Sequence, residues 1–164
     1  MNAKDVLFYG NRTMQDTLAG VPAAERETRD VCGWWSTKNI VAHLASFEWF
    51  LVDALSEFTG GGAMTYLARM SELGNQGFND YEVAQRQDHS YDQVLAEYNQ
   101  AHARTLEQVA QIPAETLRAA GRIPWYGMEY ALDDLIVYQY YGHKREHMAQ
   151  VAVFIDLLKA QGRL

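Results

Sequence analysis

The C-terminal part of the chain, from about Ala131 to Ala160, reads as one long helix, and its apolar stripe constrains the fold more than any other feature. Large apolar residues recur along it at helical spacing: Ile136, Tyr140, Val151, Phe154 and Leu158. Such a stripe is stable only when other elements cover it, because a one-sided apolar face exposed to water is unfavourable. We therefore expect this helix to turn the stripe toward the core of a helical bundle.

Three earlier segments show the same periodicity, and their ends show helix-capping signals. Ser36 and Ser90 stand where an N-cap residue is expected, and Gln93 completes a capping box with Ser90. Pro22 and Pro113 follow the ends of two of these segments. The predicted helices span about residues 3–18, 37–58 and 90–111.

The region from Ala63 to His89 is less regular, since Gly74, Gly77 and Asn79 interrupt it. We expect short helices around residues 64–73 and 80–86. A connection of this length in a compact domain is often functional, so we interpret the region as a lid or pocket rim.

The whole chain, residues 1–164, is interpreted as one all-α domain. No strand-like alternation, internal repeat or low-complexity tract is present, and 164 residues suffice for one substantial core. Four long amphipathic helices with long connections predict a four-helix bundle.

Charge and cysteine content exclude several classes of function. A formal net charge of -7 with 14 Lys+Arg argues against a nucleic-acid-binding surface. The single cysteine, Cys32, cannot form an internal disulfide, and the N-terminus has neither a signal-peptide core nor a membrane-length apolar run. We expect a cytoplasmic protein that acts on neither nucleic acid nor membranes.

Three histidines lie on the apolar stripes of two different predicted helices. His143 and His147 are four residues apart, so they lie about 40° apart around the helix and roughly 6 Å apart along it. His43 lies on the stripe of the second predicted helix, between Ile40 and Phe47. Facing helices can bring such side chains to one metal ion, although a hydrogen-bonded core histidine is an equally compatible interpretation of each residue.

Known metal-binding motifs do not fit the spacing. His143-Lys144-Arg145-Glu146-His147 formally matches H-x-x-E-H, but that signature needs a further downstream glutamate, and none follows Glu146. Lys144 excludes H-E-x-x-H, and no histidine has a glutamate three residues before it, as a di-iron bundle requires.

Two stretches resemble a known family. The segment from Gly33 to Leu44, with Phe47-Glu48-Trp49 after it, resembles the entry into the second helix of the DinB-like (DinB/YfiT) superfamily, and His143-x-x-x-His147 before Met148-Ala149-Gln150-Val151 resembles its last long helix. The resemblance implies a four-helix bundle, often a homodimer. It also implies a divalent metal ion (Zn, Ni, Mn or Fe) bound by His43, His143 and His147.

The resemblance further implies an activity. Family members transfer a low-molecular-weight thiol to an electrophile, or hydrolyse a substrate. We therefore expect a metal-dependent thiol transferase or hydrolase acting on a small electrophilic compound in detoxification or stress defence. The nucleophile would be metal-bound water or thiol, because a divalent ion with neutral ligands acidifies either one. The alternative is a small-molecule-binding or protective bundle protein without turnover.

Other polar residues receive simpler interpretations. Gln139, Glu146 and Gln150 lie three or four residues from a ligand histidine, so they are candidate hydrogen-bond partners for the imidazoles, with surface solvation as the simpler interpretation of each. His89 and His102 are interpreted as non-ligands. Glu48 lies about 140° around its helix from His43, and we expect it at a helix interface or in solvent.

The four tryptophans and Cys32 are not expected to take part in chemistry. The tryptophans are expected mainly to supply buried apolar area, and the alternative is that they line a pocket; they are Trp34, Trp35, Trp49 and Trp125. Cys32 has no histidine close by in sequence, so it is interpreted as an ordinary small buried thiol instead of a nucleophile.

Overall fold

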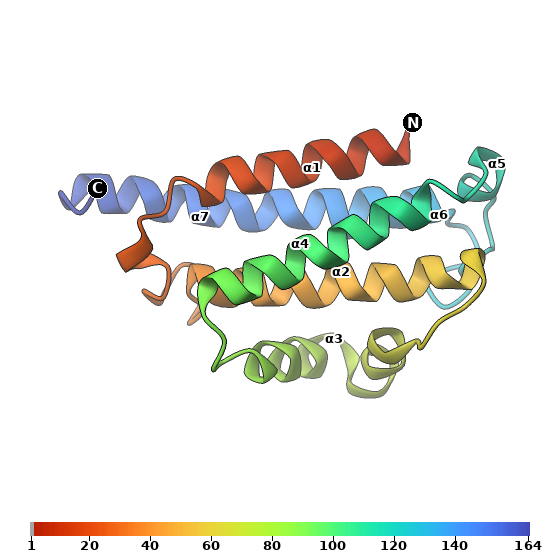
Figure 1. Cartoon of the computed structure of the whole chain (residues 1–164), viewed down its shortest axis with the longest axis horizontal. Helices are drawn as coiled ribbons and strands as arrows, with labels where there is room; N and C mark the ends of the chain where they lie inside the picture. The colour runs from red at the N-terminus through yellow and green to blue at the C-terminus, as the bar shows by residue number, and fades with distance from the viewer. Residues whose placement is uncertain (1) are drawn as a thin grey trace.

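A computed structural model describes residues 2–164, and its regular structure over this range is helical apart from one isolated bridge between Cys32 and Trp35. The predicted all-α bundle is confirmed (Figure 1). Its elements are α1 (Ala3–Leu18), η1 (Ala23–Glu25), α2 (Thr37–Thr59), α3 (Thr65–Gln85), α4 (Tyr91–Val109), α5 (Ala114–Leu117), α6 (Leu132–Leu135), η2 (Ile136–Gly142) and α7 (His143–Ala160).

The bundle consists of α1, α2, α4 and the continuous rod formed by α6, η2 and α7. Helix α2 packs against α4 on one side and α3 on another, while α1 packs along η2 and α7. Helix α3 lies beyond α2, away from α1 (Figure 1). The stripe predicted on the last helix is buried throughout, from Ile136 to Leu158.

Local sequence explains where two of the long helices begin. The Ser36 hydroxyl accepts a hydrogen bond from the backbone amide of Asn39. The side-chain oxygen of Asn39 in turn accepts one from the backbone amide of Ser36. Ser90 and Gln93 form the same reciprocal pair at the start of α4. Each box satisfies backbone donors that the first helical turn leaves unpaired.

Gly10 lets α1 approach the rod closely. A Cβ atom at this position would lie 3.0 Å from Cδ2 of Tyr141, so any larger residue would force the tyrosine ring away. The glycine costs some helix propensity but permits contact between α1 and η2.

The region from 63 to 89 is more helical than predicted. Two helical runs meet at Gly74, whose φ of 66° and ψ of 175° introduce a kink, and the second run begins after Gly74 instead of at Asp80. Tertiary contacts hold α3 at its start, where Asp53 accepts hydrogen bonds from the backbone amides of Tyr66 (2.6 Å) and Leu67 (3.0 Å).

At the end of α3, Arg86 holds the helix against α4. Its guanidinium pairs with Glu82 (2.6 Å) and Glu97 (2.6 Å). Because the contacts to Asp53 and Glu97 come from the neighbouring helices α2 and α4, local propensity underestimates the helix.

The last helix also departs from a regular α-helix, because residues 136–142 form a π-helix directly before His143. A π-turn inserts additional backbone into the helix and rotates the residues after it, and such turns are frequent at functional sites. The predicted single helix is therefore correct in extent, but its register changes just before the two histidines.

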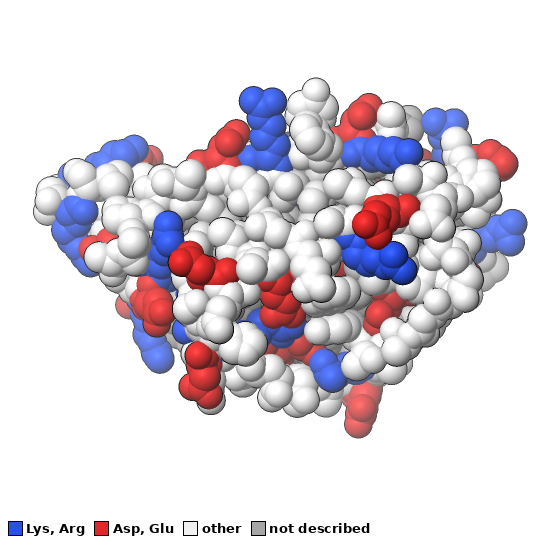
Figure 2. All heavy atoms as spheres, in the orientation of Figure 1, with Lys and Arg blue, Asp and Glu red and all other residues white. Residues whose placement is uncertain are grey.

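The surface gives no sign of a dominant charge on the face shown in Figure 2. Lysine and arginine side chains alternate there with aspartate and glutamate, and no continuous basic area forms over the described residues on this face. Within the described range, no helix is long and apolar enough to cross a membrane.

Candidate metal centre

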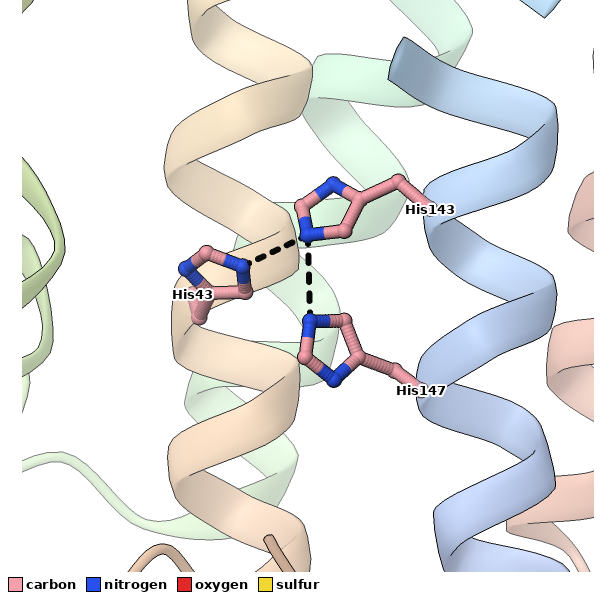
Figure 3. Close-up of side chains that lie close together, drawn as sticks. All are labelled: His43, His143 and His147. Carbon is pink, nitrogen blue, oxygen red and sulfur yellow. Dashed lines mark hydrogen bonds between the residues drawn. The ribbon is translucent and has the colours of Figure 1, made fainter. Parts of the chain in front are cut away.

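Three imidazoles from two helices converge in the core. His43 extends from α2 toward His143 and His147 of α7 (Figure 3). The Nε2 atom of His143 lies 2.8 Å from Nε2 of His43 and 3.0 Å from Nε2 of His147. One ligand nitrogen from each ring can thus be chosen so that all lie within 4.8 Å of one another. The structure therefore brings together His43, His143 and His147, the three histidines that the sequence analysis predicted to cluster.

Hydrogen bonds on the outer side of the cluster orient two of these rings. Nδ1 of His147 lies 2.9 Å from Oε1 of Gln150, and because an amide oxygen only accepts, this nitrogen donates. The His143 ring donates to the backbone carbonyl of Gln139. Both rings thus direct the lone pair of Nε2 toward the centre of the cluster, as metal-binding histidines require.

Burial keeps the cluster neutral. Desolvation, together with the proximity of the two other imidazoles, lowers the pKa of His43 to about 2. Desolvation and the nearby His147 and Lys144 lower the pKa of His143 to about 3. The pKa of His147 is also lowered, mainly by burial. Neutral imidazole is the form that binds a metal ion.

This donor set fits a divalent cation. Two Nε2 lone pairs face each other across 3.0 Å, an arrangement that is repulsive unless a positive charge lies between them. Imidazole nitrogen suits Zn, Ni and Fe, so the site does not select one metal. Three protein ligands also leave a coordination position for another molecule.

An open cavity of about 430 Å³ adjoins the imidazoles. Aromatic side chains form much of its wall, and Phe47 contacts both His43 and His143 with ring centroids 4.8 Å apart in each case. The lining residues are Trp35, His43, Phe47, Phe50, Met70, Asn75, Asn79, Trp125, Tyr126, Leu135, Gln139, His143, Glu146 and His147. A small molecule can therefore reach the nitrogens directly.

Comparison with protein families agrees with this geometry. A family model described as the DinB superfamily matches residues 10–151. The chain belongs to the DinB superfamily. No curated protein and no solved structure shows significant similarity to it. Membership confirms the predicted resemblance to the DinB-like superfamily.

A buried ion pair joins the ligand-bearing helices of this DinB-superfamily chain. Glu48 of α2 is fully buried and lies 2.8 Å from Nζ of Lys144, the residue after His143. It also accepts a hydrogen bond from Nδ1 of His102 (2.7 Å). Burial alone would raise the pKa of Glu48, but Lys144 and His102 lower it to about 2. Glu48 thus acts at a helix interface, and His102 is its partner instead of a metal ligand.

Sequence reasoning missed Asn79, which lies beside His43 and lines the cavity. The Nδ1 atom of His43 and the Oδ1 atom of Asn79 are both buried and otherwise unpaired. Asn79 raises the pKa of His43, against the larger effect of burial. No spacing rule could have linked residues on α2 and α3, because only the packing of the kinked helix brings them together.

The tryptophans fit the predictions only in part, because Trp34 is exposed and its interpretation as buried area is wrong. Trp35 and Trp125 line the cavity, and the Trp35 ring lies 4.9 Å from that of His43. Trp49 instead donates to Glu97 (3.1 Å), and Trp34 is exposed. Cys32 is half-buried and packs against the core.

We predict that the metal-free protein loses stability as the pH falls from 7 to 5. His43 and His143 stay neutral in the folded chain but gain protons below about pH 6.5 when unfolded, so the unfolded state binds more protons. His43 and His143 each then lower the free energy of unfolding by about 1.4 kcal/mol per pH unit, and the lowered pKa of His147 acts in the same direction.

Urea unfolding with chelator present, followed at several pH values, measures this slope. In the His43→Asn variant, the slope of the free energy of unfolding against pH should be smaller by the contribution of one histidine, about 1.4 kcal/mol per pH unit. An identical slope for the variant and the parent chain would contradict the assigned neutral state of His43.

Proposed function

We propose that this protein is a metal-dependent enzyme that transfers a thiol to a small electrophilic compound or hydrolyses it. The observation that supports this most strongly is the convergence of three neutral imidazoles, two of them buried and that of His143 half-buried, beside an open cavity. When bound, a divalent ion would acidify water or a thiol, so a nucleophile would be available at neutral pH.

The chain supplies a proton acceptor next to this position. Glu146 is the one carboxylate among the described residues lining the cavity, and it follows His143 by three residues on α7. A carboxylate there can take the proton that the nucleophile releases. The amides of Asn79 and Gln139 can hydrogen-bond an electrophile, while the aromatic wall can contact its apolar part.

A binding or protective role without turnover is the competing proposal. It requires the same cavity but no proton acceptor, so the position of Glu146 favours an enzyme. A homodimer and a cytoplasmic location remain predictions from the sequence; sedimentation of the purified protein tests the first of them.

The activity is tested by incubating metal-loaded protein with a panel of thiols and electrophiles. We expect conjugate or hydrolysis product from the parent chain, and product formation at least about a hundredfold slower in Glu146→Gln, since general base catalysis contributes about 10²–10⁴. The glutamine keeps the size of the side chain and removes only its basicity.

His143→Ala should abolish turnover, whereas the matched variant His89→Ala, at an exposed histidine, should not change it. Equal rates in His143→Ala and the parent chain would refute metal-dependent catalysis. Tight binding of the electrophile without any product would favour the competing proposal.

A further inference from the structure

A second hollow adjoins the metal cavity. It has a volume of about 410 Å³ and lies between the first half of α3 and the loop that contains Trp125. We name it the apolar annex; its lining residues are Phe50, Met64, Leu67, Ala68, Met70, Ser71 and Trp125. Phe50, Met70 and Trp125 also line the metal cavity, so the two hollows share a wall.

The two hollows differ in chemistry. The metal cavity presents imidazoles, amides and Glu146, whereas the Ser71 hydroxyl is the sole polar side chain of the annex among the described residues. The thioethers of Met64 and Met70 adapt to apolar groups of different shape. The annex therefore suits a hydrocarbon group and disfavours a charged one.

The position of Trp125 between the two hollows favours binding of an apolar group there. Its side chain remains 40% exposed, although it packs edge-on against Phe50 with ring centroids 5.7 Å apart. A large aromatic surface left open between two hollows gains free energy when an apolar group covers it.

The wall of the annex is held in place before any ligand binds. Asp53 accepts from the backbone amides at Tyr66 and Leu67, immediately before Ala68. The Trp49 ring stacks on Tyr66 with centroids 6.2 Å apart. A ligand would thus enter a formed groove and would not have to order the helix.

We infer that the ligand of the metal centre is elongated, with a single metal-binding head at the histidines and an uncharged alkyl or aryl tail in the annex. This inference rests on the proposed function, because the head occupies the position where the nucleophile or substrate would bind. Glu146 is the one charged side chain among the described residues lining the metal cavity, and the annex has none. A second anionic group on the ligand therefore finds no cationic partner.

Binding of alkanethiols to the Co²⁺-loaded protein tests the inference without any turnover. Ethanethiol, butanethiol and hexanethiol are titrated while the visible absorption of cobalt is recorded. We expect affinity to rise about fourfold with each added methylene, since burying one is worth about 0.8 kcal/mol. A thiol of the same length as hexanethiol that ends in a carboxylate should lose this gain.

A charge in the annex supplies the matched test. Ala68→Asp should remove the advantage of hexanethiol over ethanethiol. Thr65→Asp, exposed on the same helix but outside the annex, should retain the full dependence on chain length.

The outcomes are distinguishable. If ethanethiol, butanethiol and hexanethiol all bound with the same affinity, this result would overturn the annex alone. Cobalt binding without any response to thiols would overturn the proposed thiol chemistry together with the annex. A change of oligomeric state in Ala68→Asp, seen by sedimentation, would assign the annex to a second copy of the chain and overturn the inference.

Discussion

Glu48→Gln should lower the free energy of unfolding by about 3–5 kcal/mol, because it leaves the ammonium group of Lys144 buried without a countercharge. Glutamine keeps the volume of the side chain and can still accept from His102, so the variant isolates the loss of charge. Urea unfolding of the metal-free protein at neutral pH, followed by far-UV circular dichroism, measures the change.

Two comparisons make this result specific. Glu57→Gln, on the exposed side of the same helix, should change the free energy of unfolding by less than about 0.5 kcal/mol. The double variant Glu48→Gln/Lys144→Met should recover at least half of the loss, because no unpaired charge remains. A Glu48→Gln variant as stable as Glu57→Gln would show that the ion pair does not hold α2 against α7.

His43→Ala and His147→Ala should each weaken metal binding at least about a hundredfold. Each variant removes one of the three nitrogen donors. Loss of an outer hydrogen-bond partner of a ligand typically lowers metal affinity 10–100-fold, and loss of a ligand itself should lower it more. Competition with a chelator of known affinity measures the constants, and circular dichroism shows whether the helices persist. We expect them to persist, because the long helices are held by the cores on either side of the cluster.

His89→Ala is the matched control, since this histidine is exposed and distant in sequence from the cluster. It should bind metal as tightly as the parent chain. If His43→Ala retained that affinity, the contribution of helix α2 to the centre would be refuted.

Periodicity and capping chemistry predicted the long helices closely. The boundaries of α1, α2 and α4 agree with those expected to within a few residues, because Ser36, Ser90 and the prolines act locally. The cluster of His43, His143 and His147 was also predictable, since the spacing of these residues and their place on apolar stripes can be read from the sequence alone.

Features that depend on packing were not predictable. Asn79 reaches His43 only because α3 is anchored by Asp53 and Arg86 and kinked at Gly74. The π-helix before His143 packs against α1, which is distant in sequence. The sequence around Lys144 did not predict its pairing with Glu48, because no local rule connects residues almost a hundred positions apart.

The central claim is that His43, His143 and His147 together bind one divalent ion. Elemental analysis of protein expressed in metal-replete medium and purified without chelator tests it most directly. We expect about one divalent ion per chain, and almost none in a variant with all three histidines replaced by alanine. Parent protein that emerges without metal, or a triple variant that retains it in equal amount, would contradict the claim.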